Sequence, residues 1–171
     1  MTNTQSVLSQ RVLHLAESET LKMARMAREL RALGHDVISL SLGEPDFDTP
    51  DHIKEAAYEA LKAGYTKYTP VPGLPELTKA VSEKFKRDNN LDYKPEQIVV
   101  SNGAKQSIYN LCQALLDPGD EVVMFAPYWV SYWEIVKLSG GVPVPVYAGV
   151  EREFKPTPEQ LDAAITPRTK F

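Results

Sequence analysis

Several features that define whole classes of protein are missing from this sequence of 171 residues. It has a single cysteine, Cys112, so no disulfide can form within the chain, and its three histidines are too dispersed to form a metal site. No apolar run approaches the ~20 residues that cross a membrane, and the first residues lack the pattern of a secretory signal. We therefore expect a cytoplasmic protein that binds no metal.

An excess of positive charge is also missing. The 19 Lys and Arg residues are outnumbered by 23 Asp and Glu residues, which gives a net charge of −4. This balance argues against binding to nucleic acid or to an anionic membrane surface. Neither a Gly-x-Ser-x-Gly elbow nor a nucleotide P-loop occurs. The composition is that of an ordinary globular protein, and the length by itself predicts one domain.

The pattern of apolar residues predicts an α/β protein. Helices are predicted over 21–33, 50–63, 75–89, 104–116, 129–138 and 158–165, with Thr49 as the N-cap of the second. Strands are predicted over 37–42, 97–101, 121–125 and 142–146, and a type II turn over 117–120. From residue 97 on, strands and helices alternate, which is typical of parallel βα units in a doubly wound sheet. Cys112 falls on the apolar face of its helix, where we expect it to be buried.

Two candidate binding segments follow predicted strands. Ser101–Gln106 contains Gly103 and opens a helix, where free N–H groups and the helix dipole favour an anion such as phosphate. Lys105 lies in the first helical turn, where the dipole disfavours a cation, so a negative ligand is expected nearby. The segment 126–133 holds four aromatic residues, which suit a flat ligand above the sheet. An ordinary βα turn and ordinary core packing explain the same two segments.

Two further segments are loops. Leu42–Phe47 turns sharply at Gly43, whose backbone can approach a ligand, and 66–73 is a Pro-containing loop in which the hydroxyl of Tyr68 can reach an anion. Each segment also fits a simple turn or connection.

In their order and spacing the four segments resemble class I aminotransferases, the fold type I enzymes that use pyridoxal 5'-phosphate, and most of all the bacterial-type aspartate aminotransferases. The resemblance covers the chain from about residue 8 to residue 171. Its most specific parts are Gly43-Glu44-Pro45-Asp46-Phe47, the loop from Lys67-Tyr68 to Gly73, Asp117-Pro118-Gly119-Asp120-Glu121 and Pro127-Tyr128-Trp129. It implies the N-terminal part of that fold, a mainly parallel sheet with flanking helices, with the arm and the start of a small domain in 1–48 and the first part of the large domain in 49–171.

The resemblance also implies residue roles. Gly103, Ala104 and Lys105 match the family's phosphate loop, and Trp129 matches the tryptophan that stacks on the cofactor ring and faces the substrate carboxylate. Gly43 matches the glycine whose N–H meets the substrate α-carboxylate. Tyr68 matches the tyrosine that binds the cofactor phosphate of the other subunit, which implies a homodimer. Lys105 further aligns with the lysine that pairs with the distal carboxylate of aspartate or glutamate.

The family's catalytic Schiff-base lysine has no counterpart in this sequence, and we expect it beyond Phe171. The sequence thus resembles an N-terminal fragment, inactive by itself, of an enzyme that transfers an amino group from aspartate or glutamate to a 2-oxo acid. Two alternatives stay open. In the first, the parent enzyme is an aminotransferase of the same fold that acts on aromatic amino acids, neutral amino acids or prephenate. In the second, the chain as given is a non-catalytic module that binds cofactor or dimerises.

Overall fold

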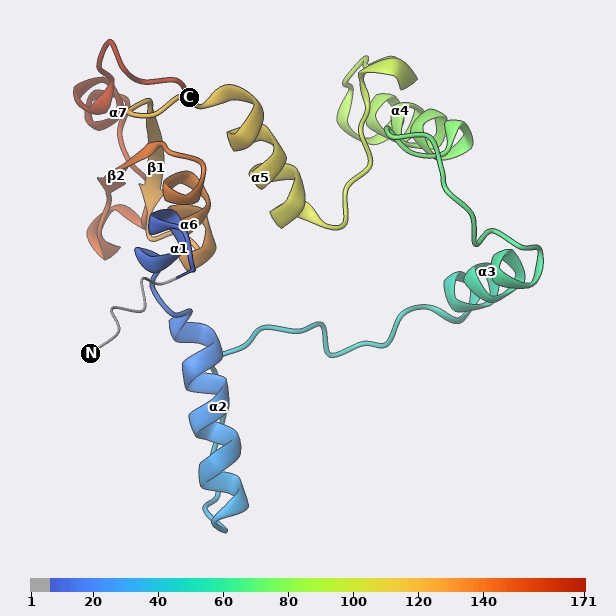
Figure 1. Ribbon diagram of the computed structural model, residues 1–171, viewed down its shortest axis with the longest axis horizontal. Coiled ribbons are helices and arrows are strands. Elements are labelled where there is room, and N and C mark those ends of the chain that lie inside the picture. Colours follow the sequence, from blue (N-terminus) through green and yellow to red (C-terminus); the bar gives the residue numbers. More distant parts are fainter. Residues whose placement is uncertain (1–6) are drawn as a thin grey trace. The chain divides into compact units, whose positions relative to one another are not determined.

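The computed structural model describes residues 7–171 (Figure 1). This part of the chain forms two compact units, one of residues 7–42 with 103–171 and the other of residues 43–102. The helices and 3-10 turns are α1 (Gln10–Leu13), α2 (Glu19–Ala32), α3 (Asp51–Lys62), α4 (Pro75–Asn89), η1 (Pro95–Gln97), α5 (Ala104–Leu115), α6 (Val130–Leu138), η2 (Val150–Arg152) and α7 (Pro158–Ala164). No helix within 7–171 is long and apolar enough to cross a membrane.

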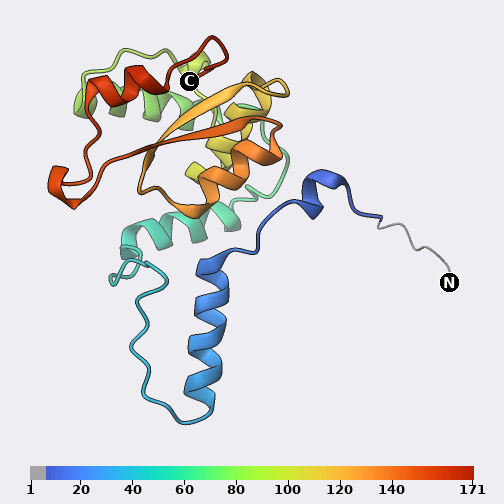
Figure 2. The ribbon, with the colours of Figure 1, turned by 90° about the vertical axis from the view of Figure 1, so that its left-hand side faces the viewer.

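The first unit is built on two parallel strands, β1 (Glu121–Ala126) and β2 (Val142–Tyr147). Their register pairs Glu121 with Val142 and Ala126 with Tyr147, and α6 makes the crossover between them. Figures 1 and 2 show α6 and α7 on opposite faces of this pair. The α/β class and the parallel βα arrangement predicted from the sequence are confirmed.

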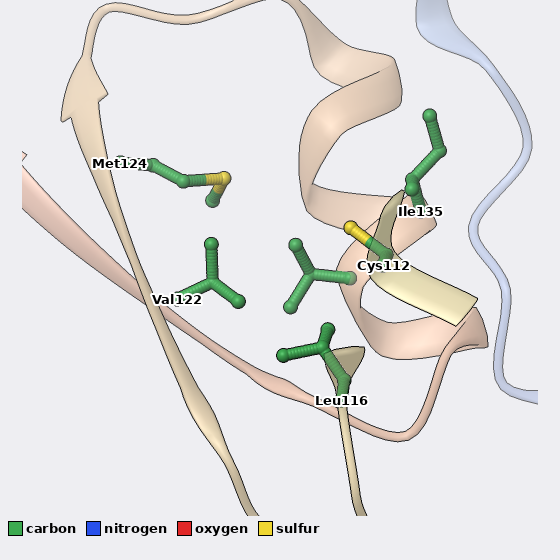
Figure 3. Close-up of a cluster of buried hydrophobic side chains, with 6 residues drawn as sticks. Cys112, Leu116, Val122, Met124 and Ile135 are labelled. Carbon is green, nitrogen blue, oxygen red and sulfur yellow. The ribbon is translucent and has the colours of Figure 1, made fainter. Parts of the chain in front are cut away.

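The core of this unit lies between β1, α5 and α6 (Figure 3). It consists of buried residues from all three elements and the turn after α5: Cys112, Leu116, Val122, Met124, Ile135 and Val136. The helical face of α5 and the alternating face of β1 thus meet as their periodicities require. Cys112 is 1% exposed, which confirms that this cysteine is a packing residue.

A third stretch of chain joins the free edge of β1. The N–H of Glu121 donates to Arg168 O at 2.8 Å, that of Lys170 to Glu121 O at 2.8 Å, and that of Val123 to Phe171 O at 2.9 Å. Residues 168–171 therefore run alongside β1, with a parallel bridge between Glu121 and Thr169. The continuation as a strand that the βα alternation predicts after α7 begins here.

The turns and helix ends follow their local sequence closely. Asp120 N–H donates to Asp117 O at 3.1 Å and Gly119 has φ +95°, as the predicted type II turn requires. Thr157 and Gln160 form a capping box at the start of α7. The N-cap of α3 is Pro50 and not Thr49 as predicted, because Pro50 has a non-helical ψ of 140° and its O accepts from the N–H groups of Ile53 and Lys54.

Two predicted strands are wrong. Residues 37–42 and 98–101 lie outside any strand, and Gln97 ends the 3-10 turn η1. Each has strand composition but pairs with no neighbouring strand: Val37 O accepts from the side chain of Arg31, and Val100 N–H donates to Pro72 O. A strand exists only through its hydrogen-bonded partner, so composition cannot establish one.

The second unit contains α3, α4 and η1. Its most buried residues are Thr78 on α4 and Ile98 just after η1. Phe85 and Tyr93 meet edge to face at 6.2 Å, and Ser82 donates a hydrogen bond to Tyr93 O, so the segment after α4 folds back against that helix. Asn90 ends α4 in the left-handed conformation, at the predicted boundary.

Candidate functional site

The start of α5 provides backbone donors for an anion. Gly103 is its N-cap, with φ +81°, and no side chain caps the helix. The first turn holds no acidic residue, and a Cβ placed on Gly103 would meet no atom within 4 Å. The N–H groups of Ala104 and Lys105 therefore point out of an open helix end, where the helix dipole adds partial positive charge. This is the local geometry on which phosphate groups bind.

Lys105 and Trp129 lie side by side in this unit. The Nζ of Lys105 is 4.1 Å from the centroid of the Trp129 ring, within the range of a cation–π contact. Lys105 is the second residue of α5, and Trp129 is the N-cap of α6, so the packing of these two helices brings the residues together. Trp129 is 45% exposed, which leaves much of its indole accessible to a ligand.

The ring of Tyr132 also contacts the indole of Trp129. The two rings meet edge to face, with centroids 5.8 Å apart and planes at 88°. Spacing three residues apart at the start of a helix places both side chains on one face. Sequence reasoning singled out the aromatic segment but not this pairing, although the i, i+3 spacing was the signal for it.

The same aromatic segment lines a cavity of about 490 Å³. Tyr128 and Trp133 have nearly parallel rings, with an angle of 5° and centroids 6.1 Å apart, and burial raises the pKa of the Tyr128 hydroxyl. Lys105 also lines this cavity, together with three glutamates, Glu17, Glu19 and Glu134. A mainly apolar cavity of this size suits a small ligand, but its three carboxylates outnumber its one ammonium group, so its lining does not favour an anion.

The other two predicted site residues belong to the second unit. The side chain of Tyr68 is fully exposed. A Cβ on Gly43 would meet no atom within 4 Å, so its backbone is open to a ligand. Among residues 7–171 no group of histidine, cysteine or acidic side chains is arranged to hold a metal ion.

Comparison with known proteins gives consistent findings. A family model described as aminotransferase class I and II matches residues 35–171. The chain is 57% identical over 164 residues to an aspartate/prephenate aminotransferase of Cereibacter sphaeroides, covering 96% of this chain and 41% of that protein. It is 55% identical over 163 residues to an aspartate aminotransferase of Bacillus subtilis, covering 95% of this chain and 42% of that protein.

Among solved structures, the aspartate aminotransferase from Thermus thermophilus with maleate superposes with a TM-score of 0.92 at 52% identity. That match covers 96% of this chain and 43% of the other. The chain thus spans about two-fifths of the length of the relatives it matches.

Proposed function

Because the chain belongs to the class I and II aminotransferase family, we propose that a protein of full family length containing it transfers an amino group from aspartate or glutamate to a 2-oxo acid. The cofactor of this reaction is pyridoxal phosphate, whose ring acts as an electron sink when it is bound. The observation that carries the proposal is the meeting of a lysine, an exposed indole and an uncapped helix start at one place.

The residues at this place fit a phosphorylated flat cofactor. A phosphate ester needs several N–H donors and a positive electrostatic environment, and the start of α5 offers both at Gly103 and Ala104. A pyridine ring needs a flat, accessible partner, which the indole of Trp129 supplies. No acidic side chain lies in the first turn of α5 to oppose the phosphate.

The chain's own residues then bind and orient the substrate. The N–H of Gly43 meets the α-carboxylate, and the ammonium of Lys105 pairs with the distal carboxylate of aspartate or glutamate. Tyr68 reaches the cofactor phosphate held by a second subunit, so the active assembly is a homodimer. The full exposure of Tyr68 supports a contact outside its own unit. In the same protein, residues 1–48 would supply the N-terminal arm and the start of the small domain, and residues 49–171 the first part of the large domain.

A second candidate substrate is prephenate. One relative at 57% identity is named aspartate/prephenate aminotransferase. The cavity beside Lys105 favours this candidate too, because Tyr128 and Trp133 form an apolar wall able to pack against a ring.

Lys105→Ala in the full-length protein tests the dicarboxylate assignment. Removing a charge-assisted contact is expected to lower kcat/KM for aspartate by about 10- to 100-fold. The loss for an apolar amino acid should be much smaller, because that substrate has no distal carboxylate. Lys79→Ala, on the exposed side of α4, is the matched control and should leave both values unchanged. Equal losses on the two substrates would refute the assignment.

A further inference from the structure

Lys105 lines the same cavity as Glu17, Glu19 and Glu134 but forms a salt bridge with none of them, and each of the three pairs with another cation. It is the second residue of α5, at the end of the helix where the dipole opposes a cation. The first turn holds no acidic residue, and Lys105 forms none of the ion pairs found within residues 7–171. Its ammonium lies over the indole of Trp129 instead, with Nζ 4.1 Å from the ring centroid.

The two members of this pair differ in mobility. Trp129 is fixed by its place at the start of α6 and by the edge-to-face contact with Tyr132. Lys105 ends in a flexible four-carbon chain with three rotatable N–H donors, so it can turn away while the indole stays in place. If the two side chains separate, the lysine is therefore the one that moves.

We propose that Lys105 rests on the indole of Trp129 in the ligand-free protein and leaves it when an oxyanion binds beside the start of α5. The identity of that oxyanion, a phosphate ester or a carboxylate, rests on the proposed function. The contact of an ammonium with a half-exposed indole is weak, and a charge-assisted hydrogen bond to an oxyanion is stronger. The lysine therefore leaves the indole and binds the anion.

Release of the lysine has a consequence for the indole. An ammonium group 4.1 Å above the ring fills the space that a stacked ring would need on that face. Anion binding uncovers this face, so the anion and a flat ring assist each other's binding. Because such coupling is reciprocal, a ring stacked there also increases the affinity of Lys105 for the anion.

The test is ¹⁹F NMR of the full-length protein, freed of cofactor and labelled with 5-fluorotryptophan. The resonance of Trp129 is the one lost in Trp129→Phe. In the ligand-free protein, Lys105→Met should shift this resonance by more than its linewidth. Saturating inorganic phosphate or succinate should move the wild-type resonance towards the Lys105→Met position and leave that of the variant in place. A response to phosphate alone assigns the lysine to the phosphate, and a response to succinate alone assigns it to the carboxylate.

Two variants control this experiment. Lys62→Met removes another lysine–aromatic contact, with Nζ 4.4 Å from the ring of Tyr58, and should behave as wild type. Lys105→Arg keeps the cation and should keep the response to anions, which also guards against misfolding of Lys105→Met.

The inference is overturned if the anions bind without moving the Trp129 resonance, if neither anion binds, or if Lys105→Met responds as wild type does. Binding of pyridoxal phosphate, followed by its visible absorbance, separates this result from the proposed function. If the protein binds pyridoxal phosphate but the anions do not shift the Trp129 resonance, only the inference about Lys105 is wrong. If the anions shift the Trp129 resonance but the protein does not bind pyridoxal phosphate, only the proposed function is wrong.

Discussion

Gly73 shows how a single residue is fixed by its surroundings. Its φ of +116° lies in a region that side chains rarely adopt. A Cβ at this position would lie 2.6 Å from Cγ2 and 3.0 Å from Cβ of Val100, closer than packed atoms approach. Both the backbone conformation and the space require glycine here, at the point where the 66–73 loop meets the segment after η1.

Gly73→Ala is therefore expected to lower the free energy of unfolding by about 2 to 4 kcal/mol, from the strained φ and the contact with Val100 together. Urea denaturation followed by circular dichroism measures the change. Gly43→Ala is the control, because its added Cβ meets no atom within 4 Å and its φ is ordinary. A Gly73→Ala protein as stable as the control would show that the loop relaxes away from Val100.

At the scale of elements, β2 is protected as an edge strand by its prolines. The N–H groups of Val142 and Ala148 donate to Asp120 O and Ala126 O, so alternate residues of β2 face β1. Pro143 and Pro145 alternate with them and face the outer edge, where they offer no N–H donor. Further along this edge, Tyr147 O accepts from the side chain of Gln160 on α7.

Replacing both prolines with threonine should restore two N–H donors to this edge and promote pairing between molecules. We expect faster growth of light scattering on warming, because the two new N–H groups lie at the outer edge of β2. Pro156→Thr, in the loop before α7, makes the same change outside the strand and should not aggregate faster. Aggregation equal in the two proteins would exclude protection of the edge by proline.

The elements also show why some sequence predictions succeeded and others did not. The start of α7 was predicted from Thr157-Pro158, and the ends of α4 from Pro75 and Asn90, because caps act over a few residues of local chain. The strand predicted over 37–42 depended on a partner that no local pattern identifies.

At the scale of the whole chain, stability depends on carboxyl groups whose ionised form accepts hydrogen bonds in the folded protein. A hydrogen bond from Thr166 and another from the Arg168 guanidinium hold the pKa of the Glu121 carboxyl below its ordinary range. The pKa values of Asp120 and Glu159 are lowered as well. Glu121 is 4% exposed and ties residues 166–171 to the start of β1, so its ionised state matters for the fold.

A carboxyl group whose pKa is lowered by folding stabilises the folded protein at pH values above its pKa in the unfolded chain. This stabilisation is lost as the pH falls through the pKa of the group in the folded protein. We therefore expect the free energy of unfolding to decrease from about pH 6 to about pH 3. Glu121→Gln should be less stable than wild type at the upper pH and should show a flatter decrease. Chemical denaturation across this range measures both, with exposed Glu96→Gln as the control. A slope unchanged by Glu121→Gln would place the pH dependence elsewhere.

The sequence by itself determined helices α2 to α7, the turn at 117–120, the burial of Cys112 and, through its resemblance, the family. These depend on residues close together along the chain or on patterns read directly from it. Only the tertiary structure decided which strands exist, that 168–171 pairs with β1, and that Lys105 lies on the indole of Trp129. Those are contacts between segments distant in sequence, fixed by packing around one core. The site roles of all six residues stay predictions: Gly43, Tyr68, Gly103, Ala104, Lys105 and Trp129.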